Sequence, residues 1–199
     1  MMNDDTIVAE IISAGRFLAT KGWAPATSGN YSMRLSDGRI AITVSGAEKG
    51  ELTPDDIMLI DKAGVPIDQR KPSAETLLHV GIYAACPDCR AVLHTHSQTA
   101  TIYTKSQPTL KAAKLRDYEL LKAYPNIKTH ETEIEIPIFD NTQDMQELQT
   151  LVDPILGKGV PAYLIRGHGL YGWGQTMMEA RRVVEATEFM LACELELRR

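Results

Sequence analysis

The chain has few cysteines, no long apolar run and no excess of positive charge. It contains three cysteines, and its first five residues, Met1 to Asp5, are acidic and lack the layout of a secretory signal. We therefore expect a cytoplasmic protein in a reducing compartment. The apolar stretches are far shorter than a membrane span. Lys and Arg total 21 against 26 Asp and Glu, a formal charge of −5, so neither a membrane nor a nucleic acid is expected as a partner.

The bulk composition predicts one domain that covers residues 1–199. Of these residues 44% are hydrophobic, which is enough for one well-packed core and too little for two comfortable ones. No repeat, low-complexity tract or linker divides the chain.

Hydrophobic periodicity and turn residues predict a mixture of helices and strands. We expect helices over 6–21, 73–85, 97–105, 117–123, 142–156 and 176–197. We expect a hairpin of 30–35 and 39–44, strands at 57–61, from 91 and at 133–138, and two strands within 162–173. This mixture predicts an α/β fold in which a mainly antiparallel sheet lies between helical layers.

Three of the five histidines stand at predicted strand ends. His94 and His96 follow the apolar run Ala91-Val92-Leu93, and His168 lies between two glycines after another apolar run. Two polar side chains at such a position rarely serve packing alone. Three neutral imidazoles are a common ligand set for catalytic zinc, with further positions open for water or substrate. His79 and His130 are expected to have structural roles.

Two further motifs favour ordinary structural interpretations. The segment from Gly167 to Gly172 matches G-x-G-x-x-G, but a strand pattern follows its glycines, whereas a dinucleotide site needs a helix there. Cys86 and Cys89 could form a redox pair or half of a zinc site. A zinc site needs a second pair, and Cys193 is alone, so we favour a plain turn between a helix and a strand.

Two glutamates and several small polar residues are candidates for chemistry. Glu75 and Glu119 could act as acid-base groups, although Glu75 could merely favour a helix N-terminus and Glu119 could be an ordinary exposed residue. Glycine-containing turns can direct backbone N–H groups at an anion. The candidate phosphate-binding residues are Ser28, Gly29, Asn30, Ser45, Gly46 and Ser73.

The order of these motifs resembles the zinc-dependent class II aldolase and adducin family, over nearly the whole chain. The resemblance rests on Thr27-Ser28-Gly29-Asn30, Ser45-Gly46, Pro72-Ser73-Ala74-Glu75, His94-Thr95-His96 and His168-Gly169-Leu170. The dehydratases of the family are the most similar members, through segments 117–122, 136–142 and 166–174.

The resemblance implies a three-layer α/β/α fold, a sugar-phosphate substrate, and Zn²⁺ held by His94, His96 and His168. It also implies a homotetramer with active sites at subunit interfaces. The position of Glu75 is the acid-base glutamate of the aldolases, and that of Glu119 is its counterpart in the dehydratases. The chain has both; we favour Glu119 and dehydration. The aldolases have two serines before the first glutamate, but this chain has Ser73 and Ala74.

Three functions stay open at this point. The first is a dehydratase, and the second is an aldolase or pentulose-phosphate epimerase that uses the same zinc site. The third is a member without activity, as in adducin, which is disfavoured because all three histidines are present.

Overall fold

The computed structural model describes residues 4–198, so the predicted domain's two ends, 1–3 and 199, lie outside the described part. Eight strands in this part form one sheet. They are β1 (Asn30–Arg34), β2 (Ile40–Thr43), β3 (Ile57–Ile60), β4 (Ala91–Thr95), β5 (Ala112–Arg116), β6 (Glu133–Phe139), β7 (Ala162–Ile165) and β8 (Gly169–Gly174). Their order is β3-β2-β1-β4-β8-β7-β6-β5. Only β6 and β7 pair in parallel, so the predicted mainly antiparallel sheet is confirmed.

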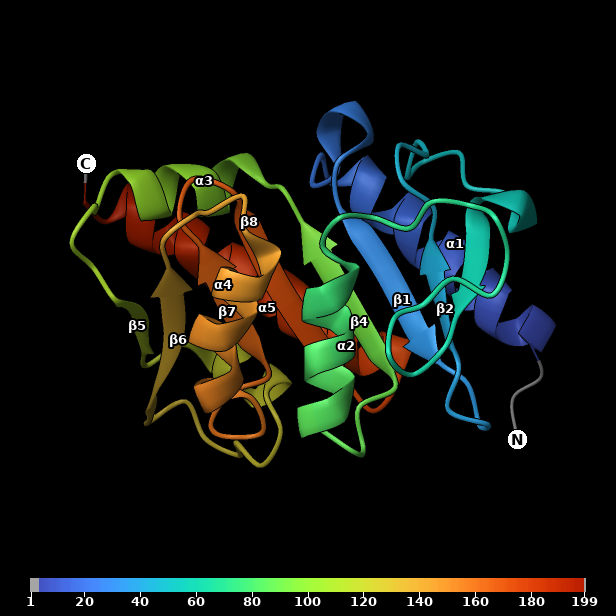
Figure 1. Cartoon of the computed structure of the whole chain (residues 1–199). Helices are drawn as coiled ribbons and strands as arrows, with labels where there is room; N and C mark the ends of the chain where they lie inside the picture. Colours follow the sequence, from blue (N-terminus) through green and yellow to red (C-terminus); the bar gives the residue numbers. More distant parts are fainter. Residues whose placement is uncertain (1–3, 199) are drawn as a thin grey trace.

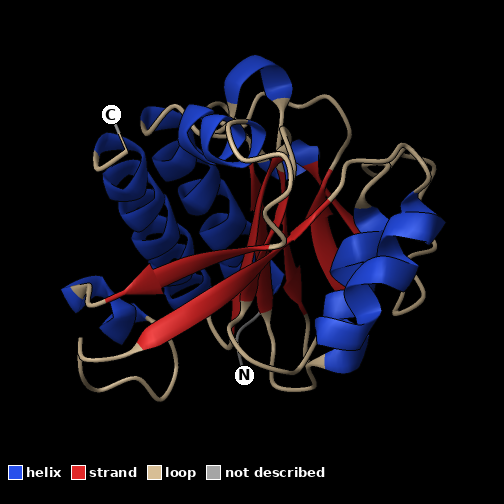
Figure 2. Cartoon of the chain, turned by 90° about the vertical axis from the view of Figure 1, so that its left-hand side faces the viewer, coloured by secondary structure: helices blue, strands red, loops and turns tan. Residues whose placement is uncertain are grey.

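Helices cover both faces of the sheet (Figures 1 and 2). They are α1 (Asp4–Thr20), α2 (Thr76–Ala85), α3 (Gln98–Lys105), α4 (Met145–Val152) and α5 (Met177–Glu196). Helices α1, α3 and α5 share one apolar core with the sheet, and α2 and α4 share the other. Along β4, Leu93 joins the first core and Val92 the second, because successive side chains of a strand point to opposite faces. The structure therefore has the three predicted layers.

Several predicted boundaries differ from the structure for local reasons. Helix α2 begins at Thr76 rather than at residue 73. Helix α4 begins at Met145 because the Asp144 carboxylate accepts hydrogen bonds from the N–H groups of the first turn, and Pro154 lies in the separate 3₁₀ turn that follows. The segment predicted as a helix over 117–123 contains a 3₁₀ helix, η3 (Glu119–Ala123).

Strand β5 was not predicted from the sequence. Its residues Ala112-Ala113-Lys114-Leu115-Arg116 include few that favour strands. Ala113 and Leu115 are nevertheless buried while Lys114 and Arg116 are exposed, and the strand pairs with β6 over its whole length. Pairing in the folded chain therefore decides this element. None of the helices within residues 4–198 has the length and apolar character needed to cross a bilayer.

A buried carboxylate lies between α5 and the start of α3. Glu188 is 2% exposed, and its Oε2 accepts a hydrogen bond of 2.6 Å from Ser97 Oγ. Its Oε1 has no hydrogen-bond partner among the described residues. Burial raises the pKa of Glu188 to about 7, although the hydrogen bond from Ser97 opposes the shift.

This carboxylate predicts a pH-dependent stability. The folded state holds the Glu188 proton more tightly than the unfolded chain does, so the stabilising contribution is present below the unfolded pKa and is lost as the pH rises through about 7. The Glu188→Gln variant lacks this titrating group. The free energy of unfolding of the variant minus that of the wild type should therefore rise by about 2 to 3 kcal/mol from pH 5 to pH 8. Urea unfolding at several pH values measures this gap. Glu131→Gln, at an exposed position, should produce no such gap, and a pH-independent gap for Glu188→Gln would contradict the prediction.

Candidate metal centre

Antiparallel pairing of β4 with β8 brings the three histidines together. Thr95 at the end of β4 is paired with Leu170 near the start of β8, so His94 and His96 lie beside the turn that carries His168. Gly169 allows this close approach, because a Cβ atom at that position would lie 1.9 Å from the Thr95 carbonyl oxygen. The backbone N–H of His96 donates to the Trp23 carbonyl oxygen and fixes the chain just beyond the strand.

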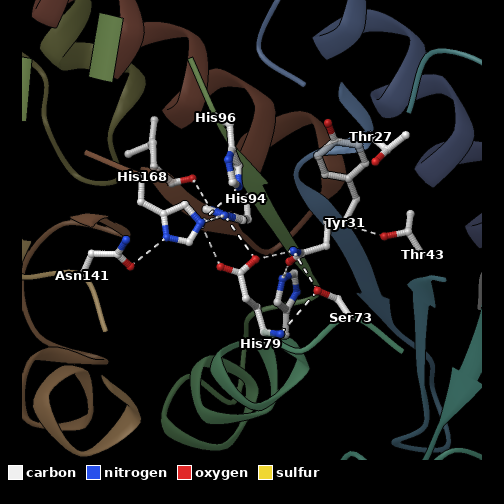
Figure 3. Close-up of polar contacts among 12 residues, drawn as sticks. Thr27, Tyr31, Thr43, Ser73, His79, His94, His96, Asn141 and His168 are labelled. Carbon is white, nitrogen blue, oxygen red and sulfur yellow. Dashed lines mark hydrogen bonds and ion pairs between the residues drawn. The ribbon is translucent and has the colours of Figure 1, made fainter. Parts of the chain in front are cut away.

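The three imidazoles point toward one another (Figure 3). The Nε2 atom of His168 lies 3.3 Å from that of His94 and 3.2 Å from that of His96. Two nitrogen ligands at 2.0–2.1 Å from a tetrahedral zinc ion are about 3.3 Å apart. The spacing therefore matches that of imidazoles that share one metal ion.

The outer ring nitrogens explain why a cation suits this cluster. The Nδ1 atom of His94 lies 3.2 Å from the Leu170 carbonyl oxygen, and that of His168 lies 3.3 Å from Asn141 Oδ1. Both oxygens only accept, so each Nδ1 carries the proton and each Nε2 presents a lone pair. Two lone pairs that face each other repel unless a cation lies between them, so the residues present fit a metal ion.

Burial keeps the imidazoles in the neutral form that binds metals. It lowers the pKa of His94 to about 3 and that of His96 to about 4. His94 is fully buried and stacks on Tyr171, with ring centroids 4.1 Å apart. The stacking follows from register, since His94 and Tyr171 are paired across β4 and β8.

Glu75 is the fourth member of the cluster. It is the residue immediately before α2, and its Oε1 lies 3.0 Å from His168 Nε2 while its Oε2 lies 3.3 Å from His94 Nε2. One ligand atom from each of Glu75, His94, His96 and His168 can be chosen so that all lie within 4.8 Å of one another. Burial acts to raise the pKa of Glu75, and the hydrogen bond from Asn30 acts to lower it.

The predicted phosphate-binding residues lie in one hollow beside the cluster. The hollow has a volume of about 410 Å³ and is lined by residues of both glycine-containing turns, Ser73, Glu75, His96 and His168. All six predicted residues line it: Ser28, Gly29, Asn30, Ser45, Gly46 and Ser73. Gly29 and Gly46 have φ angles of +78° and +81°, which L side chains rarely adopt. The Ser28 hydroxyl is buried without a hydrogen-bond partner in the described chain.

Lys49 also lines this hollow and was missed by the sequence analysis. It is 1% exposed, and its ammonium donates to the carbonyl oxygens of Thr27 and Ala47, one from each turn. In the part of the chain that the structure describes, no carboxylate lies within 4 Å of this ammonium. Burial lowers the pKa of Lys49, while Glu48 and Asp56 partly oppose the shift. A buried lysine without an ion pair is unusual, and its charge favours an anion in the hollow.

Glu119 does not join the histidine cluster of its own chain. Its side chain is 70% exposed, forms an ion pair with Lys122 and lies 3.7 Å from His130 Nδ1. The hydrogen bond from Lys122 lowers the pKa of Glu119. Glu119 lines a different hollow, next to the exposed apolar side chains of Leu120 and Phe189.

The glycine-rich segment from Gly167 to Gly172 and the pair Cys86 and Cys89 have the structural surroundings that the sequence predicted for them. The glycines from Gly167 onward lead into strand β8, not into a helix as a dinucleotide fingerprint requires. Cys86 and Cys89 are free thiols at the end of α2. Burial raises the pKa of Cys89 to about 12, which disfavours a reactive dithiol.

Comparison with known proteins defines the class. A model of the class II aldolase and adducin N-terminal domain matches residues 9–195, so the chain belongs to this family. The predicted family is thereby confirmed. Together, the family and the cluster of three histidines and one glutamate indicate a site for a divalent metal.

Two relatives similar in sequence carry the same name. The chain is 52% identical to a methylthioribulose-1-phosphate dehydratase of Methylococcus capsulatus, over 97% of this chain and 95% of that protein. It is 53% identical to a protein of the same name from Hahella chejuensis, over 96% and 93%.

Solved structures share the fold at lower identity. An L-fuculose-1-phosphate aldolase from Thermus thermophilus superposes with a TM-score of 0.79 at 26% identity, over 96% of this chain and 94% of that one. YgbL from Klebsiella pneumoniae gives a TM-score of 0.86 at 23% identity, over 99% and 92%. These comparisons agree with the observed arrangement of sheet and helices.

Proposed function

We propose that this protein is a zinc-dependent dehydratase of methionine salvage. It would convert 5-methylthioribulose 1-phosphate to 2,3-diketo-5-methylthiopentyl 1-phosphate with loss of one water molecule. The observation that carries the proposal is the match, at above 50% identity and nearly full length, to relatives named for this reaction. The convergent imidazoles support it, because their lone pairs need a cation.

Zinc is the metal proposed for His94, His96 and His168. Three neutral nitrogen ligands with room for a further ligand are typical of catalytic zinc sites. When bound, the metal ion supplies Lewis-acid stabilisation of the negative charge that develops on substrate oxygens during proton removal.

The substrate carries a phosphate on carbon 1, a ketone on carbon 2 and hydroxyls on carbons 3 and 4. The turns around Gly29 and Gly46 would bind the phosphate through backbone N–H groups and the hydroxyls of Ser28, Ser45 and Ser73. The buried ammonium of Lys49 would supply positive charge behind both turns. This arrangement orients carbon 2 and carbon 3 toward the histidine cluster.

Glu119 would move the protons. Its carboxylate takes the proton from carbon 3, and the electron pair of that bond moves toward the carbon-2 carbonyl. The protonated Glu119 then donates to the hydroxyl of carbon 4, which leaves as water as the double bond forms between carbons 3 and 4. The resulting enol becomes the 2,3-diketone by proton transfer to carbon 4.

Glu119 would reach this substrate from a neighbouring copy of the chain. Within its own chain it is exposed and outside the hollow that holds Glu75 and His168. Exposed apolar side chains of the kind that subunit contacts cover lie nearby. Leu120 and Phe189 line the same hollow as Glu119, and Ile102 lines the adjoining hollow together with Phe189. We propose a homotetramer in which each active site combines residues of two chains.

Aldol cleavage of a ketose 1-phosphate is the second candidate function. It is favoured by the place of Glu75 inside the cluster and by the fold shared with L-fuculose-1-phosphate aldolase. Product identity separates the two reactions. The zinc-loaded protein should turn 5-methylthioribulose 1-phosphate into a diketone that absorbs in the near ultraviolet. Release of dihydroxyacetone phosphate from another ketose 1-phosphate, without any diketone, would favour the aldolase.

A further inference from the structure

A chain of buried hydrogen bonds leads away from Glu75 and passes through His79. Figure 3 shows His79 below the three clustered imidazoles. The members of this hydrogen-bond chain in order are Glu75, Asn30, His79, Ser32 and Tyr83. His79 and Tyr83 are four residues apart along α2, so they lie on one face of that helix, and Glu75 precedes His79 by four residues at the helix N-cap. Asn30 and Ser32 are two residues apart in β1 and point to the same face of the sheet. The chain therefore forms where α2 packs on β1.

The contacts in this chain are short and continuous. Asn30 Nδ2 lies 2.7 Å from Glu75 Oε2 and 3.2 Å from Ser73 Oγ, and Asn30 Oδ1 contacts His79 Nε2. Ser32 Oγ lies 2.7 Å from His79 Nδ1 and 2.8 Å from Tyr83 Oη. The four other members of this hydrogen-bond chain are buried, with at most 4% of each residue exposed.

Every donor and acceptor in the chain is determined by the carboxylate at its end. Glu75 only accepts, so the amide nitrogen of Asn30 faces it and the amide oxygen faces His79. His79 then donates from Nε2 and accepts at Nδ1, from the Ser32 hydroxyl. Ser32 in turn accepts from Tyr83. All the hydrogen bonds thus point one way, toward Glu75, and such bonds polarise one another.

We propose that His79 is a positioning residue that holds Glu75 against the three imidazoles and thereby strengthens divalent-metal binding. Without its hydrogen bond to His79, the Asn30 amide can rotate and present its oxygen to Glu75, which repels the carboxylate. Glu75 then loses the contact that fixes Oε2 near His94 and Oε1 near His168. This role rests on the metal site of the proposed function, but not on the identity of the substrate.

Two substitutions at His79 test the proposal as a matched pair. The amide nitrogen of His79→Gln can take the place of Nε2 and still donate to Asn30. His79→Asn reaches only the place of Nδ1 and loses that contact. Both variants remove a buried ring, so a merely structural role predicts the same change in both. We expect the zinc dissociation constant, from competition with a chelator, to rise about 10-fold in His79→Asn, the scale usual for groups that orient ligands. It should stay close to the wild-type value in His79→Gln.

Ser32→Ala is a second variant in case His79→Asn fails to fold. It removes one oxygen atom from a buried strand and leaves the contact between Asn30 and His79 in place. Its zinc affinity should therefore fall, but by less than that of His79→Asn. Thermal unfolding of each metal-free variant shows how much stability each change costs.

The outcomes distinguish this inference from the proposed function. The positioning role alone would be overturned by equal zinc affinities in His79→Asn, His79→Gln and the wild type. It would also be overturned if the loss of zinc affinity in each variant were proportional to the fall in its melting temperature. A wild-type protein that binds no zinc would overturn the metal site and this proposal with it. Normal zinc affinity without dehydration would contradict the proposed substrate and leave the positioning role intact.

Discussion

Glu119→Gln is expected to lower turnover of 5-methylthioribulose 1-phosphate about 10²-fold or more, the usual contribution of a positioned acid-base group. The amide cannot take the proton from carbon 3. Because the Glu119 side chain is 70% exposed, its replacement should leave the folded chain and its zinc content unchanged. Steady-state kinetics with measured zinc content test this. Near-normal turnover in Glu119→Gln, with activity abolished in Glu75→Gln, would transfer the acid-base role to Glu75.

The same variant tests whether active sites combine two chains. Glu119→Gln and His168→Ala proteins should each be inactive, but co-expressed chains should form some sites with an intact histidine cluster and an intact Glu119. In a closed ring with equal amounts of both chains, about a quarter of the sites should be complete. Activity of the mixed oligomers near that fraction is the expected result. Activity no higher than that of the two separate variants would contradict a shared site.

His168→Ala is expected to remove the metal and nearly all turnover. The cluster loses one of its three imidazoles, and His168 is the one whose Nε2 contacts those of both His94 and His96. Lewis-acid stabilisation is worth several kcal/mol, so turnover should fall on the order of 10³-fold.

Metal analysis of the purified variant measures the first part of this effect. The wild type should hold one zinc ion per chain and His168→Ala much less. His130→Ala is the matched control, because His130 is an exposed histidine outside the cluster, and it should keep full zinc content. Full zinc content in His168→Ala would show that the metal binds elsewhere.

The sequence predicted the elements that depend on strong local patterns. The strand from Ala91 and the turn at His168 follow from apolar runs and glycines, and these runs become the neighbouring strands β4, β7 and β8. That the histidines meet depends on which strands pair. Periodicity does not reveal pairing, so the residue patterns alone could not show that the histidines meet; only the family resemblance predicted it.

The roles of His79 and Lys49 depend on contacts between distant segments. A spacing of four residues from Glu75 to His79 and of two from Asn30 to Ser32 is present in the sequence, but each pair alone is ordinary. Only the packing of α2 on β1 joins them into one chain of hydrogen bonds. Lys49 stands in a polar turn, and its burial comes from the carbonyl groups of two turns that fold around it.

The position of Glu119 shows a different limit. The resemblance indicated an acid-base residue, but one chain alone leaves that residue away from the histidines. A site shared between subunits would have this property, since the residues that one chain contributes to its neighbour's site lie on its own surface. Leu120 and Phe189 beside Glu119 are exposed apolar side chains, which the proposed subunit contact would cover.

The most direct test of metal-dependent dehydration is the product mass from 5-methylthioribulose 1-phosphate, with the protein as purified, after chelation and after zinc is restored. We expect a product lighter than the substrate by one water molecule, no product after chelation, and recovery that saturates at one zinc ion per chain. Undiminished water loss by the chelated protein, or a zinc-loaded protein that leaves this substrate unchanged, would contradict the account.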